Sequence, residues 1–439
     1  AERKGKTAEF EDVKLADGII VTPNLVEVDP KTLMMGDRFE RITPDEYVTD
    51  IKYVINRAYV RRSETQKEGV VGLTDFLKTA DENERIEMKN VEISAYASPD
   101  GPLDFNDELS GKRKESADQF LEGEIRQNEM DVAEELFSYL ETAEDWEGFK
   151  EMMKASDIQD KEMILRVLSM HSDPEVREQE IRNISAAFEE IKEKILPQLR
   201  RSKFTVKVDK IGWSDEELQE LWTSNPDTLK LEELLYTATL FDDFETKADI
   251  YKKASVEFPN CLRAHNNLGW AHFELGNYDE AEEAFMAAKE KKDTDVVNNN
   301  LGAVAIVNGD VEKAKELFTS SLGAGDDVNY NLGIVHIIEG DYDAAVNYFG
   351  SEPSYNAGLA MYLKGDDEGG FRTVVNLTDE TAKQYYLVAV IAASQDKPEV
   401  AMDNLRIAVD KDASLKERAK KDIEFAKLFN DPAFNEIVE

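Results

Sequence analysis

Positive charge is scarce in this 439-residue chain, which has 53 Lys and Arg residues against 93 Asp and Glu residues and a formal net charge of −40. Such an excess of negative charge favours solubility and repels phosphate backbones and anionic lipid surfaces. We therefore expect no binding to nucleic acid. Hydrophobic residues still make up 41% of the sequence, which excludes wholesale disorder and allows two or three domains with cores of their own.

Cysteine and long apolar runs are almost absent. Cys261 is the only cysteine, so no internal disulfide can form, and a small buried apolar residue is its simplest role. No apolar run approaches the roughly 18–20 residues that a helix needs to cross a bilayer, so we expect no transmembrane span. The chain starts at Ala1 rather than Met, which either a removed export signal or a trimmed start would explain.

Signatures of catalysis are missing as well. The sequence has no P-loop, no Gly-x-Ser-x-Gly run and no His-Glu-x-x-His motif. His272 and His336 occupy one position of a repeated pattern, where packing explains them better than a metal pair does. The acidic runs that begin at Asp326, Asp366 and Asp410 lack the ligand spacing of an EF-hand. We expect a non-catalytic protein with no cofactor and no bound metal.

The second half of the chain repeats with a period close to 34 residues. Unit starts near residues 228, 262, 295, 326, 351 and 382 give spacings of 34, 33, 31, 25 and 31. This is the period of helix–turn–helix solenoids. Small residues such as Gly269, Ala281 and Ala288 indicate paired helices that approach closely. The 25-residue step predicts that the second helix of the unit at 326, or the turn after it, is short.

The clearest unit, Leu268–Ala288, reads LGWAHFELGNYDEAEEAFMAA and resembles the tetratricopeptide repeat (TPR). The resemblance implies an all-α superhelix with a concave groove that binds peptides. The groove positions would be Trp270, Phe273, Ala303, Ile306, Ile334 and Ile337.

The chemistry of these groove positions leaves the occupant open. The Lys and Arg residues of carboxylate-clamp TPRs are replaced by Asn266, Asn299 and Tyr330, which disfavours a C-terminal chaperone tail as ligand. Either a protein or peptide partner lays an apolar segment in the groove, or the chain fills it by ordinary packing or with a segment of its own, for instance Lys416–Phe429.

The stretch Val91–Leu121 changes period halfway. Its first residues alternate as in a half-buried strand, Pro99, Gly101 and Pro102 break the chain, and the rest has helical spacing with Asp104 as the expected N-cap. A helix N-terminus that points at such a loop suits a carboxylate ligand.

The run Asn106, Leu109, Ser110 and Arg113 resembles the Asn-x-x-Leu-Ser-x-x-Arg motif of the OmpA-like peptidoglycan-binding domain. In that family, the resemblance implies, an acidic loop residue holds the ammonium of diaminopimelate in the peptidoglycan stem peptide, and the helix Arg holds its carboxylate. Arg113 matches this Arg, but Ser98 stands at the acidic position and Asp100 is the nearest carboxylate. The alternative is that Arg113 is a solvated or structurally paired helix residue.

The fold class that follows is α+β for an OmpA-like βαβα-β module with a helical insertion, plus an all-α TPR superhelix. We expect strands at 51–60 and 89–96 as parallel neighbours, helices at 63–80 and 104–121, a helical insertion at about 123–195, and a returning strand at Lys203–Asp209. The parts would be a β-rich segment at 1–50, the OmpA-like domain at 51–210, and the TPR domain at 211–439 with a C-terminal capping helix.

Two functions fit this organisation, both in the periplasm or at the outer membrane of a Gram-negative bacterium. The first is an anchor that binds peptidoglycan through the OmpA-like module and a protein through the TPR groove. The second is a scaffold of an outer-membrane complex whose OmpA-like module no longer binds peptidoglycan.

Overall fold

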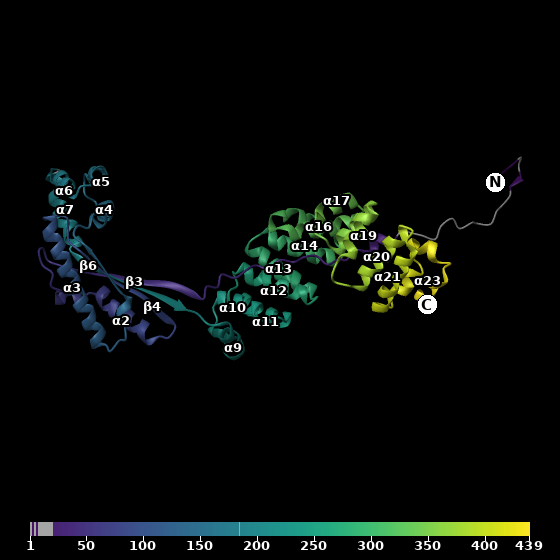
Figure 1. Cartoon of the computed structure of the whole chain (residues 1–439), viewed down its shortest axis with the longest axis horizontal. Coiled ribbons are helices and arrows are strands. Elements are labelled where there is room, and N and C mark those ends of the chain that lie inside the picture. The colour runs from purple at the N-terminus through teal and green to yellow at the C-terminus, as the bar shows by residue number, and fades with distance from the viewer. Residues whose placement is uncertain (1, 4–5, 8–20, 184) are drawn as a thin grey trace. The chain divides into compact units, whose positions relative to one another are not determined.

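The computed structural model describes residues 2–3, 6–7, 21–183 and 185–439, and the chain divides into two compact units (Figure 1). One unit, here called the repeat unit, contains residues 1–39 and Asp215–Glu439. The other, the sheet unit, contains Glu40–Ser214. This division differs from the sequence-based one, because the expected β-rich segment at 1–50 is shared between the two units.

The repeat unit begins with α9 (Asp215–Ser224) and η3 (Pro226–Thr228) and continues as six consecutive helix pairs. The pairs are α10 (Leu231–Thr239) with α11 (Phe244–Glu257), α12 (Leu262–Glu274) with α13 (Tyr278–Lys291), α14 (Asp295–Val307) with α15 (Val311–Ser320), α16 (Asp326–Glu339) with α17 (Tyr342–Phe349), α18 (Tyr355–Lys364) with α19 (Asp367–Val375), and α20 (Ala382–Ser394) with α21 (Pro398–Lys411). The predicted six-unit pattern is confirmed, and the predicted short element is α17, which has 8 residues.

Two local rules explain why these sequences form tight pairs. A glycine in the first helix of three pairs lies against a phenylalanine of the second helix: a Cβ on Gly302 would sit 2.7 Å from a ring carbon of Phe318. Several second helices start at an aspartate whose side chain accepts a hydrogen bond from the backbone N–H three residues later, which satisfies a helix-end donor. These aspartates are Asp243, Asp310, Asp341 and Asp366.

The C-terminal residues cap the last repeat. They form α22 (Leu415–Ala419), η5 (Ile423–Leu428) and α23 (Pro432–Val438). Phe425 is fully buried against Tyr386 of α20, with ring centroids 5.7 Å apart. The Tyr386 hydroxyl donates to the buried Asp422 carboxylate at 2.8 Å. The segment Lys416–Phe429 therefore covers the end of the helix stack, and the prediction that it fills the groove is wrong.

The sheet unit has four strands in the order β3-β6-β4-β5. These are β3 (Ile42–Lys52), β4 (Ile86–Tyr96), β5 (Phe137–Thr142) and β6 (Arg201–Ile211). β6 pairs antiparallel with both β3 and β4, and β4 pairs parallel with β5. The expected mixed sheet, closed by the returning strand near residues 203–209, is therefore present. Val91, Ile93, Phe204 and Val206 are fully buried and form its core with α2 (Glu68–Glu82) and α3 (Leu103–Gln127).

Three expectations about the sheet were wrong. The first strand spans Ile42–Lys52 instead of 51–60, because Lys52 lies opposite Arg201, the first residue of its antiparallel partner β6. The strands expected to be parallel neighbours are separated by β6. Residues 137–142, expected to be helical, form the edge strand β5.

The predicted helical insertion is shorter than 123–195 and contains α4 (Trp146–Ala155), α5 (Lys161–Met170), α6 (Pro174–Asn183), α7 (Ser185–Lys194) and α8 (Leu196–Leu199). Helices α4, α5, α7 and α8 contribute to a small core that includes Phe149, Met153, Ile164 and Leu199. Asp104 is not the N-cap of α3, which starts after Pro102. In the described part of the chain, no helix is both long and apolar enough to cross a membrane.

Candidate functional site: the strap in the repeat groove

An extended segment from the start of the chain lies against the repeat helices. It consists of η1 (Thr22–Leu25) followed by residues 26–39, which form neither helix nor strand, and it is called the strap here. Part of the β-rich segment expected at 1–50 lies outside the described residues, and residues 26–39 of that segment pair with no described strand. The repeat groove therefore has an occupant, and it belongs to the same chain.

Four asparagines on the first helices of consecutive repeats hold the strap by its main chain. They occupy equivalent positions, separated by 33, 31 and 25 residues, and are called the asparagine ladder: Asn267, Asn300, Asn331 and Asn356. Each side-chain amide accepts the N–H and donates to the C=O of a single strap residue. Asn300, for example, accepts from Leu33 N at 2.7 Å and donates to Leu33 O at 2.8 Å.

The other three pairs have the same geometry. Asn267 holds Met35 at 2.8 and 2.8 Å, Asn331 holds Lys31 at 2.7 and 2.9 Å, and Asn356 holds Glu27 at 2.9 and 2.8 Å. An amide that bonds both main-chain groups of one residue does what a neighbouring strand does in a sheet. The strap therefore runs in the opposite direction to the repeats and is recognised through groups that every residue except proline carries.

The residue immediately before a ladder asparagine also contributes hydrogen bonds to the strap or to the ladder. Asn266 and Asn299 donate to Leu33 O at 3.0 Å and to Lys31 O at 2.9 Å. Asn300 donates to Asn266 Oδ1 at 3.0 Å, which links adjacent repeats. Since all four ladder asparagines are fully buried or nearly so, these links fix the orientation of amides that would otherwise be costly to bury.

The register changes where the repeat spacing is shortest. Successive ladder residues hold strap residues 35, 33 and 31, but the next holds Glu27, four residues away. Pro30, which has no N–H, and Asp29 lie in this gap. The Tyr330 hydroxyl donates to Asp29 Oδ1 at 2.8 Å. Burial raises the pKa of the Asp29 carboxyl above its ordinary value, although the Tyr330 hydrogen bond and the Lys31 charge oppose that shift.

Both ends of the strap are anchored by side chains. Near its start, Leu25 is 5% exposed within the main apolar cluster of the repeat unit, and its carbonyl accepts a hydrogen bond from Tyr355 at 3.1 Å. At its end, Phe39 stacks on Tyr236 with ring centroids 4.6 Å apart. Glu232, which is paired with Arg263, also accepts the N–H of Arg38 at 2.7 Å.

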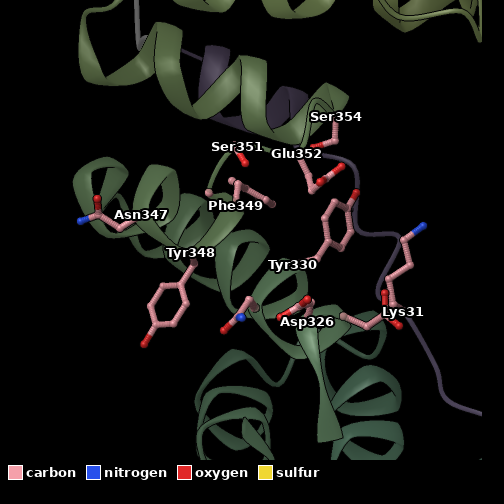
Figure 2. A pocket seen from close by; sticks show the side chains of 12 residues that line it. Lys31, Asp326, Tyr330, Asn347, Tyr348, Phe349, Ser351, Glu352 and Ser354 are labelled. Carbon is pink, nitrogen blue, oxygen red and sulfur yellow. The ribbon is translucent and has the colours of Figure 1, made fainter.

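A cavity of about 670 Å³ borders the strap at the gap in register (Figure 2). Figure 2 shows Lys31 at one side and Tyr348 of α17 at the other, with Tyr330 between them. The cavity lies where α17 is short and Gly350 turns the chain with a φ of 62°. The Lys31 side chain therefore lies at the edge of a cavity that a different side chain could occupy.

The groove residues expected from the sequence lie next to the ladder but serve packing. Ala303, Ile306, Ile334 and Ile337 are buried in the cluster that contains Leu25, whereas Trp270 and Phe273 are half-buried. The Trp270 ring packs against Phe244, with centroids 5.4 Å apart. From the sequence, Asn266 and Asn299 stand out only because they replace the Lys and Arg residues of carboxylate-clamp TPRs. The ladder asparagines lie one residue later and recur with the repeat spacing, and this recurrence is the signal that could have identified them.

In the sheet unit, three of the residues expected at a peptidoglycan site, Ser98, Asp100 and Asn106, lie in or beside one loop. Asn106 donates to Ser98 O and Gly101 O, both at 3.1 Å, and thereby closes the loop between β4 and α3. Arg200 donates to Asp100 Oδ2 at 3.1 Å and to Ser98 Oγ at 3.2 Å, and the Ser98 hydroxyl donates to Asp100. The carboxylate nearest the expected ligand site is therefore already paired with a cation.

Arg113 is fully buried and bonded to main-chain carbonyls. Its Nε donates to Arg57 O at 3.0 Å and its Nη1 to Tyr96 O at 2.8 Å. Burial lowers the pKa of Arg113 to about 10. Among the described residues, Nη2 has no hydrogen-bond partner. Arg113 thus ties the loop after β3 to the end of β4.

The remaining residues singled out in the sequence include His336 and Cys261. In the described ranges, no group of three or more His, Cys, Asp or Glu side chains is arranged to hold a metal ion. His336 is buried and stacks on Tyr348, with ring centroids 5.1 Å apart. Cys261 is half-buried at the start of α12.

Comparison with known proteins gives similarity in the repeat unit. Residues 262–295 match the tetratricopeptide repeat family. No curated protein sequence matches this chain.

Solved structures with similarity include other repeat proteins. A tetratricopeptide repeat protein from Parabacteroides merdae is 16% identical over 48% of this chain and 91% of its own, with a TM-score of 0.37. YrrB, described as a TPR protein with an unusual peptide-binding site, is 21% identical over 40% and 99%, with a TM-score of 0.32. The Cut9-Hcn1 hetero-tetramer of the APC/C is 15% identical over 50% of this chain and 44% of that one, with a TM-score of 0.41. Within residues 215–439, the helix pairs and the match at 262–295 agree: the chain contains tetratricopeptide repeats, a scaffold for protein interaction.

Proposed function

We propose that this protein is a non-catalytic scaffold whose repeat groove binds an extended polypeptide by its main chain. The asparagine ladder is the observation that carries the proposal. Four neutral amides, each a donor and an acceptor, bond the main chain of an extended segment: three hold alternate residues, and the fourth holds a residue four positions away. Because the bonds go to main-chain groups, the groove accepts many sequences, and side-chain pockets such as that of Leu25 add selectivity.

Labelled peptides test this function in a full chain whose strap is weakened. A peptide with the sequence of residues 21–39 should bind such a chain, and binding should fall at least tenfold when Asn300 and Asn331 are both replaced by Ala, since each amide makes two bonds worth about 0.5–1.5 kcal/mol each. Equal binding with and without the two asparagines would reject recognition through the main chain.

The sheet unit is proposed to serve as a platform that does not bind peptidoglycan. The OmpA-like resemblance of Asn106 and Arg113 supports a ligand-binding module, but Arg113 is engaged with two carbonyls and Asp100 with Arg200. A zwitterionic diaminopimelate would have to displace Arg200 from Asp100 and reach a fully buried Arg113 whose Nε and Nη1 are already bonded. These contacts favour the scaffold over the peptidoglycan anchor.

A pull-down on purified peptidoglycan sacculi separates the two roles of the sheet unit. The platform predicts that neither the wild-type chain nor Ser98→Asp is retained above a control protein of similar charge. Retention that is lost in Arg113→Ala, with the variant still folded, would restore the anchor.

The location in a Gram-negative envelope is proposed on the same resemblance. Cells can be fractionated into cytoplasm, periplasm and membranes, and the protein can be detected in each fraction with an antibody to test this location. Recovery in the cytoplasmic fraction alone would overturn the envelope role without affecting the groove.

A further inference from the structure

We propose that the strap is a displaceable internal ligand that keeps the groove closed, and that the partner is a protein with an extended segment that matches the strap's pattern. This inference rests on the proposed function, since it concerns the regulation and specificity of the same groove. The strap occupies all four ladder asparagines, so an external segment can reach them only by replacing it.

The way the strap is held makes it exchangeable. Between Val26 and Phe39 it forms no helix or strand, and Val28, Met34 and Lys31 are among its exposed residues. Its ladder bonds are made by main-chain groups that any competing segment can offer in the same geometry. A competing segment that displaces the strap therefore forms as many hydrogen bonds to the ladder asparagines as the strap loses, and the helix pairs stay intact.

The spacing of the ladder defines the partner's pattern. If the residue held by Asn356 is position 1, the residues held by Asn331, Asn300 and Asn267 are positions 5, 7 and 9. None of these four positions can be proline, because each donates its N–H. Position 4, where the strap has Pro30, tolerates proline.

Side-chain contacts add three preferences to this pattern. An apolar residue is favoured two residues before position 1, where Leu25 is buried. A carboxylate is favoured at position 1, where Glu27 pairs with Lys383 at 3.1 Å. A hydrogen-bond acceptor is favoured at position 3, where Asp29 accepts a hydrogen bond from the Tyr330 hydroxyl. The expected partner thus carries an extended segment of apolar and acidic residues.

Competition from the strap is strong because it is covalently attached. Within the sheet unit, Gly212 N donates to Arg41 O at 2.7 Å, so the chain leading from the strap and the chain leading to the first repeat helix are held side by side. A short tether of this kind gives an effective concentration on the order of millimolar. A peptide in trans with micromolar affinity would then bind the wild-type chain on the order of 10²–10³ times more weakly than a chain with an open groove.

The test compares three full-length chains: wild type, Leu33→Pro and Met34→Pro. Leu33→Pro removes the N–H that Asn300 accepts, whereas in the described part of the chain no groove side chain accepts the N–H of Met34. A fluorescent peptide of residues 21–39 should bind Leu33→Pro at least tenfold tighter than it binds the other two chains. A peptide that itself carries proline at the position of Leu33 should lose binding, and one with proline at the position of Met34 should keep it.

The outcomes separate failure of the inference from failure of the function. Equal affinity for wild type and Leu33→Pro would leave the groove as a binding site and reject the closed state. No binding to a folded Leu33→Pro chain would reject main-chain recognition itself. If Leu33→Pro does not fold, amide exchange of the wild-type strap in an excess of unlabelled peptide decides: faster exchange at Lys31 and Leu33 supports displacement, and unchanged exchange rejects it.

Discussion

Buried amides are the residues on which the groove depends. A primary amide that is removed from water must replace both its donor and its acceptor bonds, and an unpaired buried group costs about 1–3 kcal/mol. Asn300 is fully buried and satisfies this requirement with Leu33 and Asn266. The ladder and the strap thus stabilise each other, because each supplies the partners that the other lacks.

Asn300→Ala should loosen the strap without unfolding the repeats. We expect the amide of Leu33 to exchange about 5–150 times faster, which corresponds to a loss of about 1–3 kcal/mol in local stability. Asn298→Ala is the matched control, since Asn298 lies on the same helix but bonds Lys289 and Asp293. Equal acceleration of Leu33 exchange in both variants would contradict the assignment.

The Asp29 carboxyl should make retention of the strap depend on pH. Burial raises its pKa above the ordinary 3.8, so its stabilising contribution is complete below that value and is lost as pH rises through the raised pKa. Asp29→Asn, which stays neutral and can still accept the Tyr330 hydroxyl, should slow exchange of Lys31 at pH 7 and reduce its change between pH 4 and 7. Faster exchange in Asp29→Asn at neutral pH would show that the charged carboxylate is the stabilising form.

Arg113 is expected to matter for stability of the sheet unit. Arg113→Met removes two hydrogen bonds that a fully buried guanidinium donates to main-chain carbonyls, so the free energy of unfolding should fall by about 2 kcal/mol or more. Lys112→Met removes an exposed neighbour that is paired with Glu108, and it should change the free energy of unfolding little. Urea denaturation measures both, and a stable Arg113→Met chain would reopen the residue to a ligand role.

At the scale of elements, each repeat helix has one face buried against its neighbours and another face exposed to solvent. Ile337 of α16 is fully buried, whereas its neighbour Ile338 is 39% exposed. Ile337→Glu should therefore cost several kcal/mol in unfolding free energy through burial of an unpaired charge. Ile338→Glu should cost less than about 1 kcal/mol. Thermal unfolding of the two variants tests this, and similar melting temperatures would mean that the helix face is assigned incorrectly.

Sequence reasoning reached these elements where local signals and packing agree. The TPR pattern around Gly269 and Phe285 places the helix pairs, and the 25-residue step predicts the short α17. Alternation at Lys203–Asp209 predicts β6. Apolar residues that continue past Lys52 into the loop place the expected first strand too far along the chain. The exposed Tyr139 and Leu140 of β5 break the alternation that would predict a strand there.

The strap could not be predicted in the same way. Its bonds to Asn356 and Asn331 span about 300 residues of sequence, and they involve main-chain groups that leave no side-chain pattern. The ladder did leave a signal, since asparagine recurs at 267, 300, 331 and 356 with the repeat spacing. A buried amide that recurs on a groove face without a partner in its own helix indicates an extended polypeptide as the missing partner.

At the scale of the whole molecule, the strap belongs to the repeat unit although about 175 residues of the sheet unit separate it from the repeats in sequence. The strap follows the first helices from the last repeats to the first and continues into β3 of the sheet unit. In a protein organised in this way, the strap occupies the groove until a partner segment displaces it. The sequence of the strap shows the pattern that such a segment needs.

Amide hydrogen exchange resolved to single residues of the full chain tests this account most directly. The N–H groups of Glu27, Lys31, Leu33 and Met35 are bonded to the ladder, so they should exchange at least tenfold more slowly than those of Thr32 and Met34, which no described groove side chain accepts. An alternating pattern of slow and fast exchange through residues 31–35 is the predicted result. Uniformly fast exchange across the strap would contradict the account, because it would mean that the groove does not hold this segment by its main chain.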